Sequence, residues 1–216
     1  MGAAIDDLRA LVIGINAYGN GIPPLRSAVN DARGIAALLE ENFGYRTQVL
    51  CDGEATADGI RKALFYLQDN ATAKTRFFFY FAGHGIALDG AESADGPVGY
   101  ALPQDATTDE STFMPMQELH DALVKLPCKH LLVVLDCCFA GSFRWAGLTR
   151  KAMPSKRMYR ERFDRFLRGS AKQVITSAAH DEKALDVLSR FGDRAGDGDR
   201  HSPFAKLLME ALLGKG

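Results

Sequence analysis

The chain has 216 residues, 47% of them hydrophobic, and its 26 Lys and Arg against 27 Asp and Glu give a formal net charge of -1. This length predicts one domain that folds without a metal or a disulfide. The near-neutral charge excludes a protein that coats nucleic acid or membranes along its whole length. No apolar run is long enough for a membrane span, and the start MGAAIDDLRA is acidic where a signal peptide is basic. We therefore expect a cytoplasmic protein with no nucleic-acid or membrane partner.

Short apolar runs alternate with amphipathic segments along the chain. The runs are nearly continuous and rich in β-branched or aromatic residues, as in strands buried on both faces, and the other segments have helical periodicity. In chain order, we expect a strand at Leu11–Ile15, a helix over Ala28–Leu39, a weaker strand at Tyr45–Leu50, a helix over Ile60–Leu67, a strand at Phe77–Phe81, a helix at Met116–Val124, strands at Leu131–Leu135 and Val174–Thr176, and a helix at Pro203–Leu213. This alternation predicts an α/β fold, a mostly parallel sheet with helices on both faces.

Two segments interrupt the alternation. Residues 86–112 are rich in Gly, Asp, Ser and Thr, which is typical of a long loop, in which a small hairpin can form. Residues 143–172, here called the basic linker, hold ten bases and only two acids. Within the linker we expect an irregular part at 143–157 and an amphipathic helix at 158–168. Loops of this length inside one domain are usually functional.

A histidine and two cysteines follow two of the expected strands directly. FFFYF runs into AGHG at 82–85, and LLVVL runs into DCCFAG at 136–141. If the two strands are neighbours in a parallel sheet, His84 and either Cys137 or Cys138 lie side by side at its carboxyl edge. A cysteine beside an imidazole base is the nucleophile and proton carrier of acyl transfer. Taken singly, each residue is also compatible with a structural role, as a histidine bonded to backbone or a buried thiol.

Together the two motifs resemble the caspase and metacaspase cysteine peptidases, a clan that includes legumain and gingipain. In animal caspases the histidine lies about 50 residues before the cysteine, and here His84 precedes Cys138 by 54. The segment 136–141 is similar to the metacaspase form Asp-Ser-Cys-His-Ser-Gly, except that Phe139 and Ala140 replace His and Ser. The resemblance implies a caspase-like fold with a central sheet of about six strands.

Further segments extend the resemblance over most of the chain. These segments are 9–16, similar to the first strand, 25–32, similar to the segment that supplies an S1 aspartate, 175–178, similar to the first small-subunit strand, and 202–204, similar to the start of the last helix. The resemblance makes Cys138 the nucleophile, His84 its base, and Cys137 an inward-facing structural residue. It implies an oxyanion hole formed by the backbone N–H groups of Gly85 and Cys138.

The charge of the substrate pocket predicts which residue precedes the cleaved bond. The resemblance assigns Asp31 to the S1 pocket, and Asp136 stands where animal caspases have Gln; Ser177 is a third S1 candidate. Two carboxylates in one pocket repel each other unless a cation lies between them. The pocket is therefore expected to accept Arg or Lys at P1 of a protein or peptide substrate. The alternative is that Asp31 caps or pairs near its helix start and Asp136 orients a loop.

The resemblance also divides the single domain, 1–216, into a large-subunit-like part at about 1–142, the basic linker, and a small-subunit-like part at 173–216. In the caspase-like family this linker is where zymogens are commonly cut. The candidate self-cleavage sites lie in its irregular part and are Arg144, Arg150, Lys151, Lys156 and Arg157.

No cofactor is required by this chemistry. The acidic stretch at 193–199 lacks the EF-hand pattern, and a calcium site there is left open only because many metacaspases need calcium. No ligand spacing supports a zinc site, and the segment 14–21 has no nucleotide-binding motif. Two functions remain: a cysteine endopeptidase and a catalytically weak scaffold that binds a partner. The endopeptidase could be regulated by a regulatory domain or an upstream activator.

Overall fold

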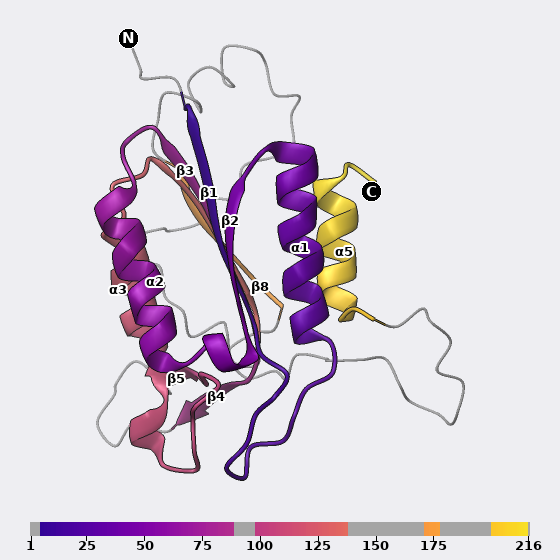
Figure 1. The fold of residues 1–216 in the computed structure, drawn as a ribbon, viewed down its shortest axis with the longest axis vertical. Helices are drawn as coiled ribbons and strands as arrows, with labels where there is room; N and C mark the ends of the chain where they lie inside the picture. Colours follow the sequence, from indigo (N-terminus) through magenta and orange to yellow (C-terminus); the bar gives the residue numbers. More distant parts are fainter. Residues whose placement is uncertain (1–4, 89–97, 138–170, 178–199, 216) are drawn as a thin grey trace, which may run out of the picture.

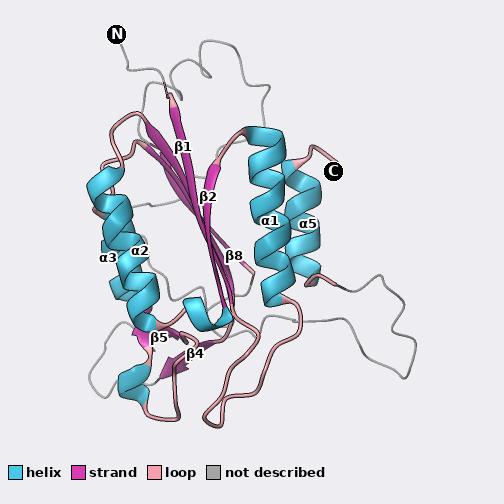
Figure 2. Cartoon of the chain, in the orientation of Figure 1, coloured by secondary structure: helices cyan, strands magenta, loops and turns pink. Residues whose placement is uncertain are grey.

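The computed structural model describes residues 5–88, 98–137, 171–177 and 200–215. Its centre is a five-stranded parallel sheet in the order β2-β1-β3-β7-β8 (Figures 1 and 2). The strands are β1 Asp7–Gly14, β2 Arg46–Cys51, β3 Thr75–Ala82, β7 His130–Asp136 and β8 Ala171–Thr176. Helices α1 Ala28–Phe43 and α5 Pro203–Leu212 lie on one side of the sheet, and α2 Ala57–Asn70 and α3 Met116–Val124 lie on the other. The predicted α/β fold with helices on both faces is confirmed.

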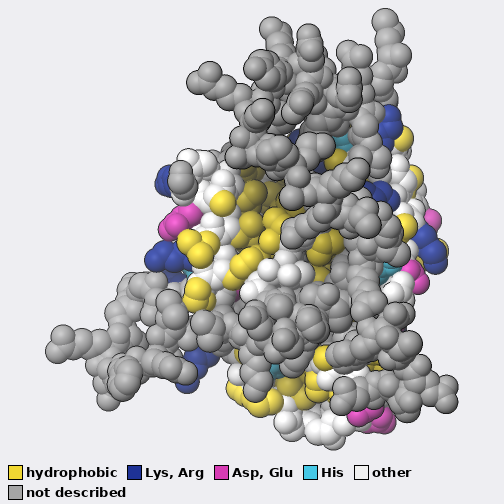
Figure 3. Space-filling view, turned by 180° about the vertical axis from the view of Figure 1, so that it is seen from behind, with side chains coloured by type: hydrophobic (Ala, Val, Ile, Leu, Met, Phe, Trp, Pro, Cys, Tyr) yellow, Lys and Arg dark blue, Asp and Glu magenta, His cyan; other side chains and the backbone are white. Residues whose placement is uncertain are grey.

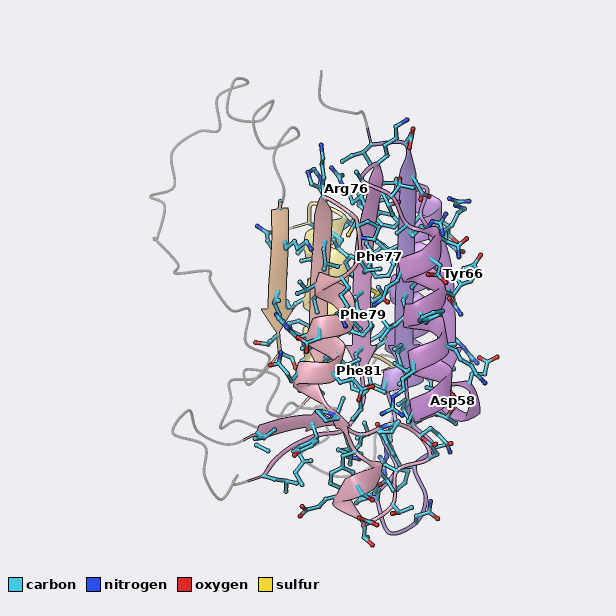
Figure 4. The ribbon with its side chains drawn as sticks, turned by 90° about the vertical axis from the view of Figure 1, so that its left-hand side faces the viewer. Asp58, Tyr66, Arg76, Phe77, Phe79 and Phe81 are labelled. Carbon is cyan, nitrogen blue, oxygen red and sulfur yellow. The ribbon has the colours of Figure 1, made fainter. Side chains whose placement is uncertain are left out.

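Strand β3 shows why the apolar runs are continuous. Its alternate side chains Phe77, Phe79 and Phe81 are at most 1% exposed and belong to the core on the side of α2 and α3 (Figure 4). Phe78 and Tyr80 belong to the separate core formed with α1. Successive side chains of a strand point to opposite faces, so a strand covered on both sides needs an apolar residue at every position.

A second, smaller sheet lies beyond the carboxyl ends of the main strands. It is antiparallel, with β4 Gly85–Leu88 paired to β5 Val98–Ala101 and β5 paired to β6 Met114–Pro115. The hairpin allowed for in residues 86–112 therefore exists, and a third strand extends it. Short 3-10 helices at Asp52–Glu54 and Glu110–Thr112 complete this end of the molecule, which lies at the bottom of Figure 1.

The number of strands in the main sheet and the start of β8 differ from what was expected. The main sheet has five strands within the described residues, against the six or so that the resemblance implied. Strand β8 begins at Ala171, two residues inside the predicted basic linker, because Ala171 and Lys172 pair with His130 and Leu131 of β7. Backbone pairing holds these residues in the strand although Lys172 is polar, and their N–H and C=O groups gain partners. The predicted helix at 158–168 and the irregular part of the linker lie outside the described residues.

The edge of the sheet at β8 is apolar in part. Ile175 of this strand is 40% exposed, and hydrophobic side chains are visible on the back of the molecule, where β8 lies (Figure 3).

A hollow of about 420 Å³ opens at the amino ends of β3 and β7, opposite the carboxyl edge. Across the described part of the chain, no helix has the length and apolar character needed to cross a membrane.

Candidate active site

The carboxyl ends of β3 and β7 meet at one edge of the sheet. The two strands are parallel neighbours with Ala82 opposite Asp136, and the Gly83 N–H lies 3.4 Å from the Asp136 carbonyl oxygen. The expected juxtaposition of the two strand ends is confirmed. His84 follows one end by two residues, and Cys137 follows the other directly.

Four groups hold His84 in place. Its backbone N–H donates to the Tyr18 hydroxyl at 2.9 Å, and its carbonyl accepts from the Leu102 N–H at 3.0 Å. The Tyr18 and His84 rings lie 4.7 Å apart between centroids. The imidazole Nε2 is 2.8 Å from the Pro23 carbonyl oxygen. Because a carbonyl oxygen only accepts, this contact assigns the proton to Nε2 and leaves Nδ1 as the basic nitrogen of the neutral ring.

Tyr18 and Pro23 were missed by the sequence reasoning. Tyr18 is 7% exposed, and its hydroxyl also donates to the Leu102 carbonyl at 3.0 Å. Burial raises the pKa of Tyr18 far above its ordinary value, so the hydroxyl remains a donor at all working pH values. No local pattern distinguishes this tyrosine, because its role depends on residues 66 and 84 positions away.

The segment that carries Tyr18 and Pro23 is itself anchored. One carboxylate oxygen of Asp52 accepts from the N–H groups of Asn16 and Ala17 at 2.7 and 2.8 Å. The Gln104 side-chain amide donates to the Ala17 carbonyl at 2.9 Å. The loop after β1 is therefore tied to two other parts of the fold, and it presents the Pro23 carbonyl to His84 from a fixed position.

The glycines beside His84 have different surroundings. A Cβ atom on Gly83 would lie 2.6 Å from the Tyr18 hydroxyl and 3.0 Å from the Phe81 ring. Gly83 is therefore required by the tyrosine that holds His84. Gly85 opens β4 opposite Ala101, immediately after the histidine.

Of the two adjacent cysteines, the structure describes one. Cys137 is 1% exposed and lies in the core on the side of α2 and α3, as expected for an inward-facing structural residue. Cys138 lies outside the described residues, as do the five candidate cleavage sites of the basic linker and the acidic stretch at 193–199.

Asp31 and Asp136 come together at the same edge, although 105 positions separate them in the sequence. Both are buried, at 1% and 7% exposure. Ser202 joins them, since its hydroxyl donates to Asp136 Oδ2 at 2.7 Å and its N–H lies 3.1 and 3.2 Å from the two Asp31 oxygens. Tyr80 donates a second hydrogen bond to Asp136 Oδ2, at 3.3 Å.

The environment disfavours charge on both carboxyls. Burial raises the pKa of Asp31 and of Asp136, and the proximity of Asp31 raises that of Asp136 further. The hydrogen bond from His201 Nδ1 to Asp31 Oδ1, 2.8 Å long, acts in the opposite direction. The nearby Ser177 hydroxyl lowers the pKa of Asp136. This hydroxyl is buried, and among the described residues no contact of it meets the distance and angle limits of a hydrogen bond. Burial and mutual repulsion therefore oppose ionisation of the two carboxyls.

Ser202 and His201 were not predicted as site residues. Ser202 is the N-cap of α5, where its hydroxyl also accepts from the Ala205 N–H at 3.0 Å. The pattern Ser-Pro before an apolar stripe does predict a helix start, but not the contact with two acids of other elements. Within the described residues, no group of three or more His, Cys, Asp or Glu is arranged to hold a metal ion.

Comparisons with known proteins identify the family of the chain. The caspase-domain family profile matches residues 7–216. Metacaspase-1 of Eremothecium gossypii is 33% identical over 148 residues, which are 62% of this chain and 32% of that protein. Metacaspase-1 of Ajellomyces capsulatus is 32% identical over 148 residues, with 62% and 40% covered. The chain thus spans well under half the length of these relatives.

A solved structure is similar in fold. The GSU0716 protein of Geobacter sulfurreducens superposes with a TM-score of 0.66 at 19% identity, over 97% of this chain and 83% of that one. This likeness shows the fold, and the family match over nearly the whole sequence shows the relationship. The chain belongs to the caspase-domain family of cysteine peptidases.

Proposed function

We propose that this protein is a cysteine endopeptidase in which Cys138 and His84 form the catalytic dyad and Asp31 and Asp136 select Arg or Lys at P1. The observation that carries the proposal is the contact between His84 Nε2 and the Pro23 carbonyl, 2.8 Å long. It orients an imidazole with a basic Nδ1 at the edge where the chain reaches Cys137.

The reaction follows from this orientation. His84 Nδ1 accepts the thiol proton of Cys138 as the sulfur attacks the scissile carbonyl carbon, and the Gly85 and Cys138 N–H groups stabilise the oxyanion. The C–N bond then breaks, and the leaving amine takes the proton from His84, which leaves a thioester. A water molecule gives a proton to His84 and attacks the thioester, and the departing sulfur recovers a proton. The chemistry uses only groups of this chain and needs no cofactor.

Charge supports the basic P1 specificity. Burial raises the pKa of Asp31 and of Asp136, and the nearby Asp31 raises that of Asp136 further, so a bound cation would stabilise the ionised pair. A guanidinium or ammonium group supplies the missing positive charge, and a P1 aspartate adds to the repulsion.

The test is a panel of peptides that differ only at P1, with wild type, Cys138→Ala and Cys137→Ala. We expect hydrolysis after Arg and Lys by wild type and Cys137→Ala, and none by Cys138→Ala. Turnover that survives in Cys138→Ala rejects the nucleophile, and a preference for Asp at P1 rejects the pocket. A folded wild type that cleaves none of the peptides favours the scaffold function instead.

Self-processing is a further part of the proposal. The irregular part of the basic linker contains the P1 residues that the pocket would accept, and proteolysis requires an extended segment. Cleavage after Arg144, Arg150, Lys151, Lys156 or Arg157 would release a loop that can then rearrange around the active site, which is an order–disorder switch. The substrates of the mature enzyme are proteins with accessible Arg or Lys residues.

A further inference from the structure

The acid pair, Asp31 and Asp136, already accepts hydrogen bonds from other groups of the chain. Asp31 is 1% exposed, and its carboxylate accepts from the Ser202 N–H, from His201 Nδ1 and from the Ser27 hydroxyl. The His201 side chain is 32% exposed, whereas Ser202 is 3% exposed and also caps α5. Ser27 is 2% exposed. A substrate cation that approaches Asp31 from solvent therefore meets the imidazole, which is the most exposed of these three partners.

Space for the imidazole is provided by a glycine of α1. A Cβ atom on Gly34 would lie 3.0 Å from His201 Cε1 and 3.2 Å from Met209 Sδ. Glycine inside a helix is less favourable than alanine, so Gly34 weakens α1 locally. Its effect is to let the ring lie against α1 with Nδ1 directed at Asp31.

We propose that His201 is a specificity-determining residue of the S1 pocket, because its imidazole occupies the carboxylate oxygen of Asp31 that the cation of a P1 Arg or Lys must take. Substrate binding displaces the imidazole ring from Asp31, while the Ser202 N–H stays bonded to Asp31 and the Ser202 hydroxyl to Asp136. Arg is favoured over Lys, since a planar guanidinium replaces the lost hydrogen bond and contacts a second oxygen. This inference rests on the proposed P1 specificity and adds an internal competitor to it.

Kinetics of two variants test the competition. His201→Ala is expected to lower KM for Arg peptides about tenfold with kcat unchanged, because binding no longer breaks a hydrogen bond to a charged group. Gly34→Ala is expected to act in the same direction by moving the ring, and alanine favours the helix, so this variant remains folded. His120→Ala in α3, on the other side of the sheet, is the matched control with unchanged KM. An unchanged or higher KM in both variants overturns the inference.

A second measurement separates this inference from the proposed function. Agmatine, which carries the guanidinium of an Arg side chain, is added to Cys138→Ala protein labelled at its 5 histidines. We expect it to shift the His201 imidazole resonances, and Asp31→Asn to abolish the shift. If agmatine inhibits hydrolysis of Arg peptides competitively but leaves these resonances unchanged, the role of His201 is wrong and the proposed function stands. If wild type cleaves no Arg or Lys peptide and agmatine does not bind, the proposed specificity fails and the inference with it.

Discussion

The substitution Asp136→Asn separates the function of the acid pair from its cost in stability. Both hydroxyl donors, from Ser202 and Tyr80, bond to the same oxygen of Asp136, Oδ2. An asparagine whose amide oxygen takes that position keeps both hydrogen bonds, and its NH₂ group replaces the other oxygen. The variant therefore removes the charge with little change in packing.

For activity, the expected effect is a large loss. A hydrogen bond to a charged group in a desolvated site contributes about 1.5–3 kcal/mol, and every 1.4 kcal/mol is about a tenfold change. We therefore expect kcat/KM for Arg peptides to fall by about ten- to a hundredfold in Asp136→Asn. Equal kcat/KM in wild type and variant would refute the assignment of Asp136 to the S1 pocket.

For stability, Asp136→Asn is expected to have the opposite effect, a gain instead of a loss. The raised pKa of Asp136 means that the folded state binds this proton more tightly than the unfolded state does. Wild type therefore loses stability as the pH rises from about 4, the ordinary carboxyl value, through the folded pKa, and stays lower above it. Asparagine does not titrate, so the variant gains unfolding free energy relative to wild type over this interval.

Urea unfolding from pH 4 to 8, in a Cys138→Ala background that prevents self-digestion, measures this difference. Asp58→Asn on α2 is the control, because the Asp58 side chain is 71% exposed and pairs only with Lys62 among the described residues. We expect its effect to stay within about 0.5 kcal/mol. If the stability difference between Asp136→Asn and wild type does not change with pH, Asp136 carries no unfavourable buried charge.

Three further experiments test the positioning of His84 and the cleavage of the basic linker. Tyr18→Phe leaves the His84 N–H and the Leu102 carbonyl without their partner, so unfolding free energy should fall by about 1–3 kcal/mol and kcat should fall more than KM changes; an unaltered kcat would contradict the positioning role. Gly83→Ala brings a methyl group to 2.6 Å from the Tyr18 hydroxyl, so melting temperature and kcat should both drop, and a variant that melts like wild type would show that the tyrosine can move. Intact-mass measurement should find fragments that end at the candidate sites of the basic linker in wild type and not in Cys138→Ala; an uncut wild type that still cleaves Arg peptides would show that processing does not control the enzyme.

Local patterns in the sequence were sufficient for the strands of the main sheet and the described α-helices, and for their order along the chain. The apolar runs at Phe77–Phe81 and Leu131–Leu135 are the centres of β3 and β7, the run at Leu11–Ile15 covers the carboxyl half of β1 and one residue beyond it, and the apolar stripes lie on the helices. Strand ends were harder to predict, since β8 begins at Ala171 because of pairing with β7 rather than apolar character. The hairpin in 86–112 acquired a third strand for the same reason.

The sequence by itself determined that a histidine and a cysteine follow buried strands, because strand ends are local features and parallel strands share a carboxyl edge. Only the tertiary structure decided which groups surround them. The Pro23 carbonyl lies 61 positions from His84, and His201 lies 170 positions from Asp31. Such contacts depend on how distant segments meet in space, and neither hydrophobic periodicity nor helix capping carries information about that.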